Sequence, residues 1–210
     1  MALGDWDFFE TGGATEGIQT VGPILGAGSL EVNTASSDNW HGQRNSGFSR
    51  GFTKGKIRSI LRWDVATGTI GSGLFCMSDQ ETLLNASADL YAAELFPGVS
   101  VNNINLYHYQ TGIDVGSGTL LGQAQVNFAI GATMPIELEW NLDLVGLGGI
   151  LLIVRTGNSG DLDYTNLTQK VIHTDFTPLT TAFAEGIYST SGGSGNQTVL
   201  FDTTEIFSGA

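Results

Sequence analysis

Glycine, asparagine, serine and aspartate interrupt this chain about every 8 to 14 residues, and no helical repeat of apolar residues competes seriously with the short segments between them. The segments between them are short and either apolar or alternating, as in 104–109, 136–140 and 199–202. Alternation places one face of a strand on a core and the other in water. Breaks at this spacing are typical of sandwiches, so the sequence predicts an all-β, two-sheet antiparallel β-sandwich with about a dozen strands and little helix.

The strands are expected where apolar or alternating residues run between turn residues. They are Asp7–Thr11, Gly28–Asn33, Gly47–Phe52, Lys56–Asp64, Gly71–Ser78, Thr82–Leu95, Asn102–Gln110, Leu120–Ala129, Pro135–Leu142, Gly149–Thr156, Gln169–Thr174, Ala182–Ser189 and Thr198–Phe207. The run Ile150–Val154 is apolar at every position, which predicts a central strand covered on both faces. Asp79–Leu95 also admits a short amphipathic helix.

The length favours one domain over residues 1–210, because all-β sandwiches of 200 to 250 residues commonly form a single unit. The first residues contain no basic segment followed by an apolar run, so no secretory signal peptide is predicted. The longest apolar run, Leu147–Val154, is too short to cross a bilayer. We therefore expect a soluble protein made in a cytosol, with no membrane partner.

The net charge of −13 is unevenly distributed along the chain. Six of the eight basic residues fall within nineteen positions and are called the basic stretch here: Arg44, Arg50, Lys54, Lys56, Arg58 and Arg62. A basic strip on an acidic protein predicts a contact with a partner or with another copy. A solvated strand edge, protected from aggregation by charge, is the alternative. Nucleic acid is not expected as a partner because the net charge repels phosphate.

The sequence carries no catalytic signature. The Gly-x-Ser-x-Gly turn of a serine hydrolase is absent as part of a strand-to-helix unit, and His41, His108 and His173 lie far apart. Cys76 is the single cysteine and is expected to be a buried structural thiol. Glu137 and Glu139 share a strand face, as a pair of glycosidase carboxylates would, but the polar face of an edge-exposed strand also explains them. We therefore predict a protein that is not an enzyme.

Two short segments contain candidate ligand-binding residues. Asn158, Asp161 and Asp163 offer oxygen atoms of the kind that Ca²⁺ prefers, but the segment lacks the EF-hand pattern and a closing glutamate. No metal or other cofactor is therefore predicted, with Ca²⁺ as the alternative. Trp40 lies in a polar segment and is expected to be the most exposed tryptophan, able to stack on a sugar ring.

The chain resembles the concanavalin A-like, laminin G-type jelly rolls at three places. These are Asp7-Phe-Phe-Glu-Thr-Gly-Gly13, Gly55-Lys-Ile-Arg-Ser-Ile-Leu-Arg62 and Val199-Leu-Phe-Asp-Thr-Thr-Glu-Ile-Phe207. The resemblance implies that the first and last strands pair. Enzymes of this fold carry a Glu-x-Asp-x-x-Glu strand, which this sequence lacks. Their glycosidase activity is therefore not transferred to this chain.

Acidic, Gly-rich and Thr-rich chains of this kind, without a disulfide or a secretion signal, resemble capsid decoration (cement) proteins of tailed bacteriophages. That resemblance implies a virion structural protein, made in the host cytoplasm and located on the capsid surface. It would associate with itself, as a trimer, and bind the major capsid protein, stabilising the shell by its binding free energy. A carbohydrate-binding or receptor-binding module is the alternative reading, and a glycan-cleaving enzyme is a third.

Overall fold

A computed structural model describes residues 5–44, 50–80, 88–97, 102–113, 118–142 and 148–209. The strands in these residues are β1 (Trp6–Thr11), β2 (Thr15–Gln19), β3 (Ser29–Ala35), β4 (Asn39–Arg44), β5 (Lys54–Thr67), β6 (Ile70–Ser78), β7 (Leu90–Phe96), β8 (Asn102–Tyr109), β9 (Thr119–Val126), β10 (Thr133–Asn141), β11 (Ile150–Thr156), β12 (Thr168–Asp175), β13 (Ala184–Ser191) and β14 (Asn196–Ser208). The all-β prediction is confirmed. The described chain contains no helix long and apolar enough to cross a membrane.

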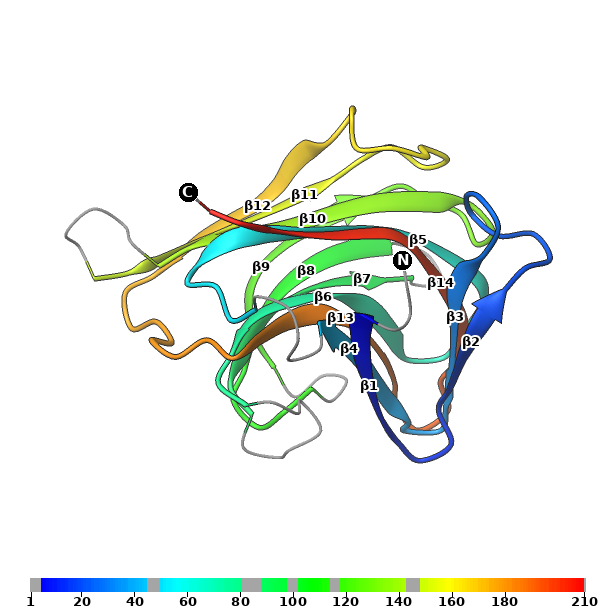
Figure 1. Cartoon of the computed structure of the whole chain (residues 1–210), viewed down its shortest axis with the longest axis horizontal. Coiled ribbons are helices and arrows are strands. Elements are labelled where there is room, and N and C mark those ends of the chain that lie inside the picture. Colours follow the sequence, from blue (N-terminus) through cyan, green and yellow to red (C-terminus); the bar gives the residue numbers. More distant parts are fainter. Residues whose placement is uncertain are drawn as a thin grey trace.

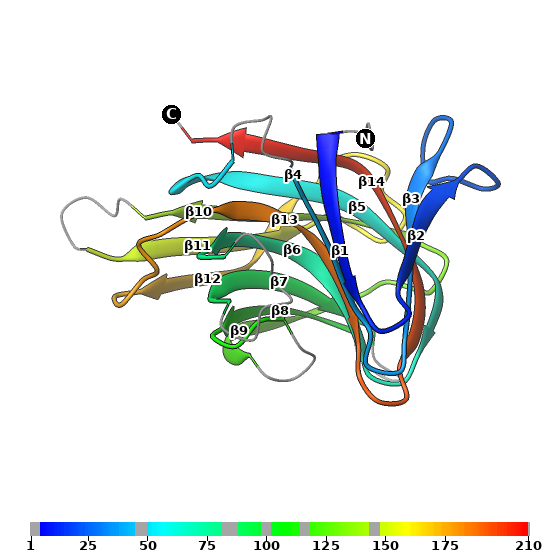
Figure 2. The ribbon, with the colours of Figure 1, turned by 60° about the horizontal axis from the view of Figure 1, so that its bottom comes forward.

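The strands form two seven-stranded antiparallel sheets. Sheet A has the order β1-β4-β13-β6-β7-β8-β9, and sheet B has the order β12-β11-β10-β5-β14-β3-β2. Figure 1 shows sheet B above sheet A, with β1 and β2 carrying the chain from one sheet to the other. The turned view shows β13, β6, β7, β8 and β9 succeeding one another across sheet A (Figure 2). The predicted two-sheet sandwich is therefore confirmed.

The main core fills the space between the sheets. Trp40, Trp63 and Trp140 are buried there, together with Phe201 and aliphatic residues of both sheets. Each of these buried indole N–H groups has an acceptor, because Trp40 donates to Glu16, Trp63 donates to Gln197 and Trp140 donates to the Phe52 carbonyl. Cys76 belongs to this core, as predicted, and burial raises the pKa of its thiol. The core therefore excludes water without leaving these ring donors unpaired.

The strand order corrects the pairing that the resemblance implied. β1 pairs with β4 in sheet A, whereas β14 lies in sheet B between β5 and β3. The first and last strands therefore do not pair. The apolar run in β11 is also not covered on both faces, since Leu151 and Ile153 are partly exposed. β11 lies next to the edge strand β12, and its outer face is open to solvent.

Two strands were missed because their residues are too polar to show an apolar pattern. β2 is a short, largely exposed strand, and β4 contains histidine, glutamine and glycine. The predicted strand Gly47–Phe52 lies partly outside the described residues, and 50–52 do not form a strand. The expected Thr82–Leu95 strand and its helical alternative also extend over residues outside the description. The described part of that segment forms β7 from Leu90 to Phe96.

Candidate functional site

Trp40 is not the exposed aromatic residue that the sequence predicted. Its side chain is 1% exposed, stacks on Phe8 and Phe201, and donates its ring N–H to Glu16. Its strand has polar residues on the outward face, which made the segment look like a loop, but Trp40 points to the core. A side chain buried in this way cannot stack on a sugar ring.

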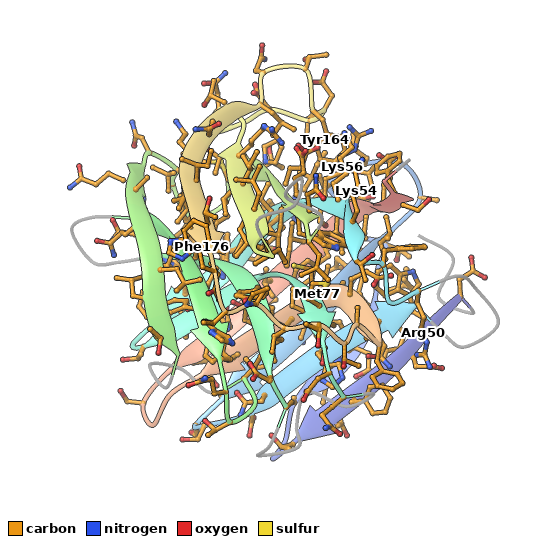
Figure 3. The ribbon with its side chains drawn as sticks, turned by 90° about the vertical axis from the view of Figure 1, so that its left-hand side faces the viewer. Arg50, Lys54, Lys56, Met77, Tyr164 and Phe176 are labelled. Carbon is orange, nitrogen blue, oxygen red and sulfur yellow. The ribbon has the colours of Figure 1, made fainter. Side chains whose placement is uncertain are left out.

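The basic stretch is divided between the sheets. Arg44 ends β4 in sheet A, whereas Lys54, Lys56, Arg58 and Arg62 occupy alternate positions of β5 and share the outer face of sheet B. Figure 3 shows Lys54 and Lys56 near Tyr164, with Arg50 set apart. The partner-binding role of these residues stays a prediction.

Three cations of β5 already have acidic partners in the same chain. Lys56 lies 3.5 Å from Glu137, Arg58 lies 2.6 Å from Glu205, and the side chains of Arg62 and Asp64 are 2.7 Å apart. The Arg58 guanidinium also lies over the ring of Tyr164. Because these three cations are paired within the chain, β5 offers a partner less positive charge than the sequence suggests.

Glu137 and Glu139 also belong to this charged face. β10 lies inside sheet B, so the prediction of an edge-exposed strand is wrong, and Glu137 is only 3% exposed. Both carboxylates accept hydrogen bonds from Arg155, at 2.7 and 2.5 Å. Two carboxylates held by one guanidinium form a structural ion-pair network and do not present a free acid and nucleophile.

The acidic side chains of the 158–163 loop accept hydrogen bonds from that loop and from the residues just after it. Asp161 accepts hydrogen bonds from the backbone N–H of Asn158 and the amide of Asn166, and Asp163 accepts from Thr165. No group of three His, Cys, Asp or Glu residues able to hold a metal occurs in the described ranges. Calcium at this loop stays the alternative to the predicted absence of a cofactor.

A more complete polar arrangement lies on the face of sheet A that is turned away from sheet B, which we call the outer face of sheet A. One row of directly paired residues crosses all seven strands of this sheet. In order from β1 to β9 the row is Phe9, His41, Tyr188, Gly73, Glu94, Asn105 and Gln123. Because register partners project from the same face, their side chains line a single band across the sheet.

Glu94 is the centre of this band. Its Oε2 accepts hydrogen bonds from the hydroxyls of Tyr188, at 2.8 Å, and Tyr109, at 3.1 Å. Its Oε1 is buried and has no hydrogen-bond partner. Burial raises the pKa of Glu94 to about 7, although the two tyrosine hydroxyls act in the opposite direction. The carboxyl group can therefore change its protonation state near neutral pH.

Glycines make room for Glu94. A Cβ atom at Gly71 would overlap the Glu94 side chain, and one at Gly73 would overlap the Ala93 carbonyl oxygen. Neither position leaves space for a larger residue between β6 and β7.

We predict that Gly73→Ala destabilises the protein by about 2 to 3 kcal/mol, because the added methyl group collides with backbone that cannot rotate away. Urea denaturation measures the effect. Gly17→Ala is the matched control, since a Cβ at Gly17 meets nothing within 4 Å and β2 is exposed. Equal stability of the two variants would contradict the close packing at Gly73.

Further buried polar atoms on this face lack partners. Both ring nitrogens of His41, both side-chain amide atoms of Gln43 and the Thr190 hydroxyl are buried and unbonded. Desolvation lowers the pKa of His41 to about 3, so its ring is neutral and keeps one donor and one acceptor. Buried polar atoms without protein partners are rare in native proteins, and each calls for a specific explanation.

The band opens to solvent at its β8–β9 end. Gln123 is exposed, Tyr107 is partly exposed, and the Asn105 amide links the two by donating to the Tyr107 hydroxyl and accepting from Gln123. The Tyr107 and Tyr109 rings are 5.4 Å apart. A ligand at this edge would contact an aromatic ring and two amides, with Glu94 behind them.

No protein-family model matches the sequence, and no curated protein matches it. Solved structures do match. The exoplasmic/lumenal domain of VIP36, in a form bound to Ca²⁺ and Man3GlcNAc, has a TM-score of 0.60 at 12% identity over 99% of this chain and 85% of that chain. The legume lectin-like domain of Entamoeba histolytica has a TM-score of 0.58 at 12% identity, over 99% and 92%. These likenesses show a legume-lectin-like β-sandwich.

A fold similar to that of this chain also occurs in an enzyme. The PL-14 alginate lyase of Aplysia kurodai has a TM-score of 0.59 at 11% identity, over 99% of this chain and 93% of that chain. The predicted concanavalin A-like jelly roll is confirmed by these structures. The fold alone assigns no activity, and the likeness to phage decoration proteins is not among these findings.

Sequence reasoning missed the outer face of sheet A. One signal was available, because Glu94 is a single acid within the otherwise apolar Leu90–Phe96. An acid at such a position is unfavourable unless its environment compensates for burial. Its partners Tyr109 and Tyr188 are 15 and 94 residues away in the chain, so only the fold brings them to it.

Proposed function

We propose that this protein binds carbohydrate on the outer face of sheet A, entered from the β8–β9 end. The observation that carries the proposal is the buried, unpaired Oε1 of Glu94 on β7, next to β8 with its partly exposed Tyr107 and near the exposed Gln123 of β9. The hydroxyl groups of a sugar both donate and accept hydrogen bonds, so they can pair with carboxyl, amide and imidazole groups together. A tyrosine ring offers the apolar face on which a sugar ring packs.

The charge of the protein favours an uncharged glycan at this site. The net charge is −13, and Glu94 adds a negative charge to the band whenever it is ionised. A polyanion would be repelled, whereas a neutral sugar gains hydrogen bonds to groups that are otherwise unpaired. The lectin-like fold of VIP36 in its Man3GlcNAc-bound form supports the same class of ligand.

A glycan array followed by isothermal titration calorimetry tests the proposal. We expect Tyr107→Ala to weaken binding by about tenfold, since the sugar would lose its ring contact. Gln123→Ala should weaken it several-fold, whereas Gln169→Ala should have no effect. Gln169 is the matched control because it is also an exposed glutamine on an edge strand, but in sheet B. A folded protein that retains no glycan, or equal losses in both glutamine variants, would exclude this site.

A further inference from the structure

A cavity lies away from the outer face of sheet A, at the edge where the two sheets meet. β9 and β12 are edge strands of opposite sheets, and Gly122 of β9 lies against Val171 of β12. At one end of this seam is a groove of about 390 Å³, which we call the edge groove. Its polar lining comes from Gln125, Asn127, Thr156, Asn158, Ser159 and Lys170.

A β-bulge places Lys170 at this groove. Val154 pairs with Val171 and Arg155 pairs with Gln169, so Lys170 is the extra residue between two paired positions. A bulge turns a side chain out of the regular alternation of its strand and often does so at functional sites. No ion pair of Lys170 occurs in the described part of the chain. The lysine therefore differs from the cations of β5 that have acidic partners.

Thr156 provides an independent indication of a ligand. It is 0% exposed and lines the edge groove, and its hydroxyl is buried without a hydrogen-bond partner. A buried hydroxyl without a protein partner is energetically unfavourable. A ligand group that reaches the end of the groove would supply the missing hydrogen bond.

The loop that carries Asn158 and Ser159 is held in place by hydrogen bonds. Gly157 N–H donates to the Pro135 carbonyl, Gly160 N–H donates to the Thr133 carbonyl, and the Asp161 carboxylate accepts from Asn158 N–H. The Asp161 carboxylate is therefore bonded to the backbone of its own loop. The loop backbone that carries Asn158 and Ser159 is thus held before any ligand arrives, which lowers the entropy cost of binding.

We propose that the edge groove binds a hydroxyl-rich carboxylate of the uronic acid class. Lys170 would hold the carboxylate, while Thr156 and the amides of Asn127 and Asn158 would pair with hydroxyl groups. An ammonium bound to a carboxylate forms a charge-assisted hydrogen bond, stronger than a neutral one. A single uronate carries one negative charge, so the acidic protein repels it far less than it repels a long polyanion. This proposal is independent of the neutral-glycan site on sheet A.

Calorimetric titration with D-glucuronate tests it, with glucose as the neutral probe and acetate as the carboxylate without hydroxyls. We expect glucuronate to bind at least about tenfold more tightly than either probe, and Lys170→Gln to remove that preference. Thr156→Val should also weaken glucuronate binding while the melting temperature holds or rises, because the unpaired hydroxyl is replaced by a methyl group of similar size.

Lys56→Gln is the matched control, since it removes one positive charge from the outer face of sheet B. Equal losses in Lys56→Gln and Lys170→Gln would show nonspecific attraction and overturn the proposal. So would a wild-type protein that does not distinguish glucuronate from glucose. Tyr107→Ala should leave glucuronate binding unchanged, so failure at the edge groove is separable from failure of the glycan site on sheet A.

Discussion

Replacing Glu94 with glutamine is expected to change the stability of this protein by about 3 kcal/mol relative to the wild type between pH 4 and pH 8. The folded-state pKa of Glu94 is raised from 4.5 to about 7, so the folded protein binds the proton more tightly than the unfolded chain does. The stability that this proton provides is fully present below pH 4.5 and is lost as the pH rises through about 7. Glutamine stays neutral, and the variant therefore gains on the wild type as the pH rises.

Urea denaturation of both proteins across this range measures the difference between their free energies of unfolding. Glu10→Gln is the control, because Glu10 is an exposed carboxylate on β1 and its replacement removes the same charge without burial. A constant difference between Glu94→Gln and the wild type at all pH values would contradict the buried, unpaired state of the carboxyl oxygen. The same variant can also be tested for glycan binding, because Glu94 lies next to the residues proposed to contact the glycan.

His41→Phe is expected to remove the destabilising effect of His41 in acid, a contribution of about 5 kcal/mol near pH 3 that Glu94 partly offsets in the wild type. The pKa of His41 is lowered from 6.5 to about 3 in the folded state, so the unfolded chain takes up the proton first. Stability from the neutral ring is fully present above pH 6.5 and is lost as the pH falls through about 3. Phenylalanine keeps the ring contacts with Phe9 and Phe75 and carries no titrating nitrogen.

Circular dichroism melts of His41→Phe and the wild type from pH 7 to pH 3 test this. The partly exposed His173 on β12 provides the control variant His173→Gln, which should retain the acid-induced loss. Between pH 4.5 and 6.5 the effects of Glu94 and His41 have opposite signs, so the wild type should show a flatter profile than either single variant. Parallel profiles of stability against pH for His41→Phe and the wild type would refute the lowered pKa of His41.

The predicted capsid partner, trimeric self-association and virion location stay predictions. Light-scattering mass and co-sedimentation with capsid shells over a salt series would test them. Charge reversal of Arg50, Lys54 and Lys56 to glutamate should abolish shell binding if the basic stretch forms the contact. Unchanged binding would exclude that role.

The sequence predicted the fold class because the relevant signals are local. Turn residues and alternation act within a few positions, so most strands were found, including β5, β8, β10 and β14. β2 and β4 were missed because an edge strand and a strand with a polar outer face do not show an apolar pattern. The orientation of Trp40 was wrong because a polar segment can be a strand whose alternate residues enter the core.

By itself, the sequence determined an acidic, all-β sandwich with a buried cysteine and no familiar catalytic motif. The tertiary structure decided which polar residues meet. The Glu94 carboxyl is joined by tyrosines from β8 and β13, and Lys170 reaches the edge groove through a bulge. These arrangements depend on strand order and register, which pair residues far apart in the chain and are set by the packing of whole sheets. Local sequence patterns therefore do not specify the strand order that brings these residues together.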